Sequence, residues 1–140
     1  MNNRIEQHVK KGRLRIREKD PAKIASLLHS AEVNAGVVLS MSLTEVTATV
    51  IFQRIYESIH QVADALWLEK GYEARDHDTS LEIFKEFYIS GDELDYYKGI
   101  RNEATYRGYL VHKHQAEKII VFWKDKIVNT LQQVKREKVV

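Results

Sequence analysis

The stretch SLTEVTATVIFQRIYESIHQVADALWLEKG, residues 42–71, decides the fold. Ser42 and Glu45 have the spacing of a helix-capping box, and Gly71 is the residue type that ends a helix, so a long helix is predicted to follow the box and to run to Lys70. Its apolar positions recur every three or four residues, as in an α-helix, and their stripe is wide enough to be buried on more than one side. The stripe comprises Val46, Val50, Ile51, Ile55, Ile59, Val62, Ala63, Leu66 and Trp67. This pattern is typical of the central helix of a bundle.

The rest of the chain also predicts helices. Asp20 can cap a helix that Pro21 begins, because a proline at the first helical position loses no hydrogen bond. Residues 90–92 (Ser, Gly, Asp) are expected to separate two later helices. The predicted helices cover about 21–39, 81–88, 92–107 and 112–138. With short connections they predict an all-α fold, an antiparallel four- to five-helix up-and-down bundle over residues 20–140, preceded by a basic N-terminal arm or short helix over residues 1–19.

Composition excludes several classes of site. The 140 residues include no cysteine, which excludes disulfides, thiolate metal sites and cysteine nucleophiles and fits a reducing cytoplasm. No apolar run approaches the length of a membrane span, and the N-terminus lacks the apolar core of a signal peptide. We therefore expect a cytoplasmic protein that is not in a membrane, with neither a metal nor a cofactor.

Charge is distributed unevenly along the chain. The net charge is +5 over residues 1–23, −7 over residues 24–112 and +4 over residues 113–140. Basic ends can attract an anionic partner such as RNA. Charged terminal turns are also common as ordinary solvated faces of helices, so both interpretations stay open.

The strongest candidate site lies in residues 94–109, LDYYKGIRNEATYRGY. On a helix Asn102 and Tyr106 share a face, and Lys98 lies one turn before Asn102. An arginine offers a planar fork of donors that suits phosphate, so Arg101 is expected to contact phosphate, Asn102 to orient it, and Tyr106 to hydrogen-bond or act as a weak acid. The alternative is that these residues only cap the helix and form salt bridges.

A second candidate is the polar connection after the long helix. His77, between two aspartates, could titrate near neutral pH or hold a phosphate together with Arg75. Alternatively Asp78 or Thr79 caps the next helix, and the connection has no other role.

His60 and Asp64 are four residues apart on the long helix, a spacing that can bind a metal. The sequence offers no third ligand nearby, so a local hydrogen bond between them is favoured.

Three motifs follow one another within residues 20–135. They are RIYES at 54–58 with ALW at 65–67 and KGY at 70–72, then RDH at 75–77, then IRN at 100–102 with YRG at 106–108. Together they resemble the HEPN superfamily, a group of small helical-bundle proteins. The last motif, read as R-N-x-x-x-Y-R-G, is the most specific of the three.

The resemblance implies an antiparallel bundle that dimerises and places the motif of each protomer at a shared cleft. Many members are metal-independent ribonucleases in which an arginine is followed, after four to six residues, by a histidine. Arg101 matches that arginine and Asn102 the polar residue often beside it. Tyr106 stands where the histidine is expected, and His112 lies beyond the permitted spacing. A histidine exchanges protons near neutral pH, whereas a tyrosine ordinarily stays protonated there.

The function implied is a homodimer that binds RNA or nucleotide phosphate through Arg101, Asn102 and Tyr106, with attraction from Arg107. One rival interpretation is that the protein also cleaves RNA, as a metal-independent endoribonuclease of a toxin-antitoxin or defence system. The alternative is a non-catalytic partner subunit of a small nucleotidyltransferase. In some HEPN proteins of that kind the transferase modifies a tyrosine near the motif, and Tyr106 and Tyr109 lie close to that place.

Overall fold

The computed structural model describes residues 3–89 and 91–138. Residues 1–2, 90 and 139–140 lie outside the described part. The elements are α1 (Asn3–Lys10), β1 (Leu14–Ile16), α2 (Pro21–Leu39), α3 (Ala48–Glu69), β2 (Tyr72–Ala74), α4 (His77–Phe87), α5 (Asp92–Arg107), α6 (Lys113–Phe122), the π-helical turn η1 (Trp123–Ile127) and α7 (Val128–Lys138). The predicted all-α class is confirmed, because most of these residues are helical. Among the described helices none has the length and apolarity needed to cross a membrane.

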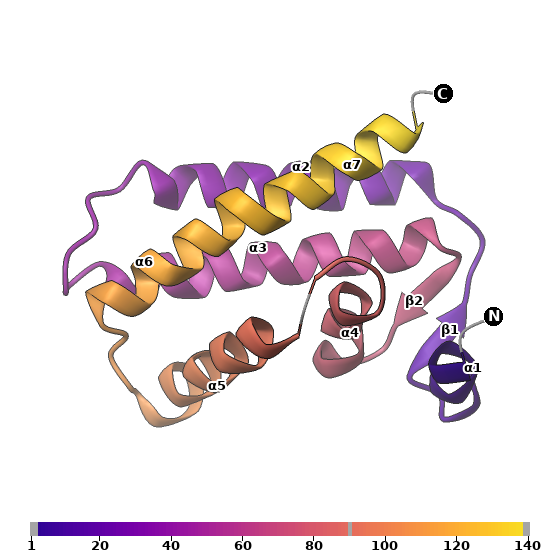
Figure 1. The fold of residues 1–140 in the computed structure, drawn as a ribbon, viewed down its shortest axis with the longest axis horizontal. Helices are drawn as coiled ribbons and strands as arrows, with labels where there is room; N and C mark the ends of the chain where they lie inside the picture. Colours follow the sequence, from indigo (N-terminus) through magenta and orange to yellow (C-terminus); the bar gives the residue numbers. More distant parts are fainter. Residues whose placement is uncertain (1–2, 90, 139–140) are drawn as a thin grey trace.

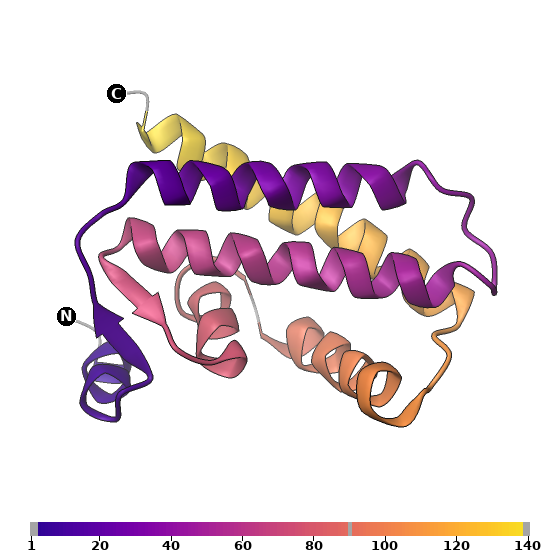
Figure 2. The same ribbon diagram turned by 180° about the vertical axis from the view of Figure 1, so that it is seen from behind.

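The long helix α3 is the centre of the fold. It packs against α2, α4, α5 and α6. Figures 1 and 2 show α2 and α3 lying side by side, α6 and α7 crossing them obliquely on one face, and α4 and α5 along the other edge of α3. The strand β2 and the turn η1 also contact α3, so elements from most of the chain meet on this helix.

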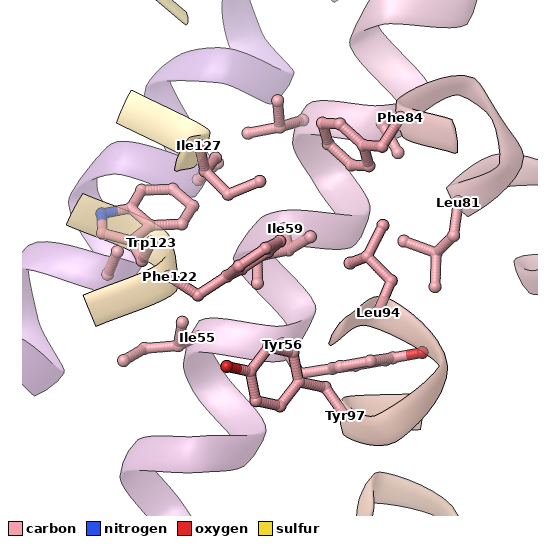
Figure 3. Packing of buried hydrophobic residues seen from close by; sticks show 14 of the residues in the cluster. Ile55, Tyr56, Ile59, Leu81, Phe84, Leu94, Tyr97, Phe122, Trp123 and Ile127 are labelled. Atoms are coloured by element: carbon pink, nitrogen blue, oxygen red, sulfur yellow. The ribbon is translucent and has the colours of Figure 1, made fainter. Parts of the chain in front are cut away.

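The core gathers around the buried face of α3. Ile55 and Ile59 are fully buried there, and Figure 3 shows them between side chains from η1, α4 and α5. The other labelled residues around them are Tyr56, Leu81, Phe84, Leu94, Tyr97, Phe122, Trp123 and Ile127. The inward stripe predicted from residue 51 onward is thus confirmed.

The predicted start of the long helix was wrong. Val46 and Val50 were expected inside, but they are 88% and 48% exposed, and α3 begins at Ala48. The Thr44 hydroxyl accepts hydrogen bonds from the backbone N–H groups of Val46 and Thr47, at 3.1 and 3.2 Å. This local side-chain turn competes with a capping box at Ser42, so the regular helix starts later.

A two-stranded antiparallel ribbon closes one end of the molecule and was not predicted. Arg15 of β1 pairs opposite Glu73 of β2, and Arg17 also forms an ion pair with Glu73. Lys23 Nζ lies 3.6 Å from the same carboxylate. Burial would raise the pKa of Glu73, but the arginines and the lysine outweigh it and lower that pKa. Strands of three residues show no alternation that a sequence pattern could reveal.

The first turn of α4 is fastened to α3 by buried hydrogen bonds. The indole N–H of Trp67 points to the carbonyl oxygens of Thr79 and Ser80, at 3.1 and 2.9 Å. The hydroxyl of Ser80 donates to Asp64 Oδ1 at 2.6 Å. These bonds fix the residues at the start of α4 over the C-terminal part of α3.

Asp76 caps α4. Its Oδ1 accepts from the backbone N–H of Thr79 at 2.7 Å, so the expected caps Asp78 and Thr79 were wrong by two or three positions. Asp76 is extended just before the helix, the conformation that lets a short side chain reach back to the free N–H groups. His77 consequently becomes the first residue of α4.

Tyr97 and Gly108 fix the helix that carries the main motif. The Tyr97 ring is buried against Phe122, with ring centroids 5.3 Å apart, and its hydroxyl reaches the Lys118 carbonyl oxygen at 3.1 Å. Burial, and then Glu93, raise the pKa of Tyr97. Gly108 ends α5 at φ +69°, as predicted for a left-handed cap. Arg101 lies one helical turn after the buried Tyr97, so the packing of Tyr97 fixes the position of Arg101 on α5.

Candidate functional site

A pocket of about 490 Å³ lies where α3, the start of α4 and α5 meet. It is lined by Tyr56, Asp76, His77, Asp78, Lys98, Arg101, Asn102 and Tyr106. Five of these were predicted as site residues, and the fold brings them together from two helices that are separate in sequence. Tyr56 was expected only as part of the helix, Asp76 as part of the connection, and Asp78 only as a cap.

Arg101 is the central cation of this pocket. Its Nη1 lies 3.3 Å from Asn102 Oδ1 and 3.5 Å from the Tyr106 hydroxyl, and its guanidinium stands 5.9 Å from the centroid of the Tyr56 ring. Within the described residues no carboxylate lies within 4.0 Å of it. The Arg101 guanidinium has five N–H donors, and the two oxygens near it, those of Asn102 and Tyr106, are both neutral and at long hydrogen-bond distances.

The aspartates of the pocket are already engaged. Asp76 caps α4, and Asp78 Oδ1 forms an ion pair with Lys98 Nζ at 2.8 Å. That pair also occupies Lys98, which the sequence places on the same helix as Arg101 and which was predicted as a nucleic-acid-binding residue together with Arg75, His77 and Arg107. The uncompensated positive charge is thus that of Arg101, and an anion would complete its coordination.

Tyr56 forms the buried wall of the pocket and was missed as a site residue. It is 4% exposed, and burial raises its pKa to about 12 although Arg101 acts in the opposite direction. Its hydroxyl therefore stays protonated and can donate a hydrogen bond. The apolar periodicity of the long helix gave no sign of this, because an aromatic residue beside Ile55 fits a core position equally well.

His77 lies against a second histidine, His60 of α3. The ring centroids are 4.1 Å apart and the planes are tilted by 54°. Burial lowers the pKa of His77, the nearby His60 and Arg101 lower it further, and Glu57 and Asp64 oppose the shift. His77 is therefore neutral near pH 7 and can accept a proton.

His60 is itself held by Asp64. Its Nδ1 lies 3.4 Å from Asp64 Oδ2, the proximity that the four-residue spacing predicted. No group of three or more His, Cys, Asp or Glu side chains suited to a metal ion occurs in residues 3–89 and 91–138.

A second pocket of about 290 Å³ adjoins the first and shares Asp76 and His77 with it. Arg75 lines this second pocket and not the first. Arg107, also predicted to bind nucleic acid, lines neither pocket and lies 3.8 Å from Glu103. The seven predicted site residues are thus divided among the first pocket, the second pocket and the open surface.

A larger hollow of about 820 Å³ runs between α5 and the α6–η1 segment. Its lining includes four carboxylates, two lysines and a histidine but no arginine: Asp92, Glu93, Glu117, Asp125, Lys118, Lys126 and His114. Excess acid makes it unsuitable for an anion. The smaller pocket at Arg101 is the better candidate for phosphate chemistry.

Comparisons of this chain with family models, with curated proteins and with solved structures find no match.

Proposed function

We propose that this chain is a HEPN-like RNA-binding protein whose Arg101 pocket holds a backbone phosphate. The observation that carries the proposal is the uncompensated guanidinium of Arg101, held between Tyr56 and Tyr106 in a pocket whose acids are already engaged. A phosphate accepts two parallel hydrogen bonds from an arginine, and the Asn102 amide and tyrosine hydroxyls can supply more.

The same pocket supports metal-independent cleavage of RNA. The motif of HEPN ribonucleases places a histidine four to six residues after the arginine, whereas this pocket contains His77 from α4. Neutral His77 would take the proton of a ribose 2′-hydroxyl as its oxygen attacks the adjacent phosphorus. The bond to the 5′-oxygen breaks, that oxygen takes a proton from Tyr106, and a 2′,3′-cyclic phosphate remains. Arg101 would stabilise the charge that builds on the phosphate oxygens.

Cleavage of a mixed RNA pool in EDTA tests this step. We expect the wild type to cut, and the Arg101→Ala and His77→Asn variants to lose at least about a hundred-fold in rate. Arg107→Ala is the matched control, because Arg107 is an exposed arginine at the end of the same helix outside the pocket. Equal cutting by Arg101→Ala would contradict the assignment, and no cutting by the folded wild type would restrict the function to binding.

A second candidate function is a partner subunit of a small nucleotidyltransferase. Tyr106 is 73% exposed, so its hydroxyl is accessible to a modifying enzyme. Mass spectrometry of the protein isolated from its native cells would reveal a nucleotidyl group on Tyr106; an unmodified tyrosine and no copurifying transferase would count against this candidate.

The homodimer of the HEPN resemblance is part of the proposal and is tested separately. Light scattering of the purified protein should give the mass of two chains. A monomer at micromolar concentration would refute the shared cleft but leave the phosphate pocket of one chain to be tested on its own.

A further inference from the structure

The second pocket has a chemistry opposite to that of the first. One face of α3 forms its floor, because Glu57, Gln61 and Asp64 recur at spacings of four and three residues. Leu27 and Ala74 provide apolar walls. Through Asp76 and His77 it continues directly into the Arg101 pocket, so one ligand can occupy both.

Two buried acceptors on this floor have no partner. The His60 side chain is 9% exposed, and neither its Nε2 nor Gln61 Oε1 has a hydrogen-bond partner in the described part of the chain. Nδ1 of His60 faces Asp64, and the tautomer with its proton on Nδ1 presents Nε2 as an acceptor. Buried polar atoms nearly always have partners, so these two point to a ligand rich in donors.

The charges around the second pocket lead to the same requirement. Three carboxylates line it, those of Glu57, Asp64 and Asp76, and they would repel a phosphate. The cation that lines it is Arg75, whose side chain forms no ion pair with a described residue. A matching ligand has several N–H donors on one edge and a pair of acceptors on another.

We propose that the second pocket binds a guanine base whose nucleotide phosphate lies on Arg101. Guanine presents its N1–H and amino donors on one edge, suited to the carboxylates and Gln61, and O6 and N7 acceptors on another, suited to the fork of Arg75. Adenine presents an acceptor at N1 and a donor at N6, so it would leave acceptors of the floor unpaired. The exposed ring of His77, between the two pockets, offers a surface on which the base stacks.

This inference rests on the proposed phosphate site, and calorimetric titrations separate the two. The ligands are GMP, AMP and inorganic phosphate. We expect the wild type to bind GMP about ten-fold more tightly than AMP, because one good bidentate base contact gives about that discrimination. Glu57→Gln and Arg75→Gln should each reduce the GMP-to-AMP ratio several-fold and leave phosphate affinity unchanged. Arg101→Ala should weaken all three ligands and keep the ratio.

Glu18→Gln is the control for the loss of a carboxylate, since Glu18 is exposed and lines neither pocket. Equal affinity for GMP and AMP, with phosphate still bound, would overturn the guanine site and leave the proposed function intact. A ratio unchanged in both Glu57→Gln and Arg75→Gln would also overturn it. If neither phosphate nor nucleotide binds, both proposals are wrong.

Discussion

The hydrogen bonds from the Trp67 indole should be the main link between α3 and the part of the site that α4 carries. Trp67 is fully buried, and its N–H reaches the carbonyl oxygens of Thr79 and Ser80. Trp67→Phe removes the donor, so the two carbonyl oxygens lose the hydrogen bond that joins them to α3, at a cost of about 1–2 kcal/mol. The smaller ring also leaves a void that costs about 1–2 kcal/mol. We therefore expect a loss of about 2–4 kcal/mol in the free energy of unfolding.

Trp123→Phe is the matched control. Trp123 is also buried, at 3% exposure, but the structure shows no hydrogen bond from its indole to a described residue. It should lose only the packing share, about 1–2 kcal/mol. Urea denaturation followed by circular dichroism gives both values, and hydrogen exchange at residues 77–81 should be faster only in Trp67→Phe. If Trp67→Phe costs no more than Trp123→Phe, the indole does not fasten α4.

Three further predictions concern backbone and charge. Gly108→Ala should destabilise the protein by about 1 kcal/mol, because φ is +69° there. Gly99 lies inside α5 with open space around it, so Gly99→Ala should stabilise the protein by about 0.5–1 kcal/mol. Thermal melts of the two variants test both values. Glu73→Gln should cost about 1 kcal/mol at pH 7. Because folding lowers the pKa of Glu73, this cost should vanish in urea titrations as the pH falls through that lowered pKa. Folding also lowers the pKa of His77, so the wild type should lose stability as the pH falls below the pKa of a histidine in the unfolded chain. His77→Asn should flatten this dependence of the free energy of unfolding on pH, which urea titrations at several pH values would measure.

The helical framework could be predicted because its signals are local. The cap at Asp20, the left-handed Gly108 and the apolar period of α3 each act within a few residues of sequence. The two-stranded ribbon could not be predicted, because each strand has only three residues. Its strands are joined by an ion pair between Arg15 and Glu73, which lie far apart in the sequence. Hydrogen bonds to the Thr44 side chain likewise make α3 start at Ala48, later than the capping box at Ser42 predicted.

The pocket shows the same division between local and long-range information. Residues of one helix turn, such as Arg101 and Tyr106, could be grouped from their spacing. The contact of His77 with His60 depends on how Trp67 and Ser80 seat α4 on α3, and no spacing in the sequence encodes that. The histidine that lines the Arg101 pocket comes from α4, so no spacing along α5 could have predicted it.

The most direct test of the central claim is the salt dependence of binding to a short single-stranded RNA. Wild type, Arg101→Ala and the control Arg107→Ala would be compared by fluorescence anisotropy across a range of salt concentrations. The account predicts that Arg101→Ala weakens binding by about ten-fold or more and reduces the slope of log affinity against log salt by about 0.7, the share of one phosphate contact. Arg107→Ala should change affinity much less. An Arg101→Ala protein that is folded and binds RNA with wild-type affinity and slope would contradict the account.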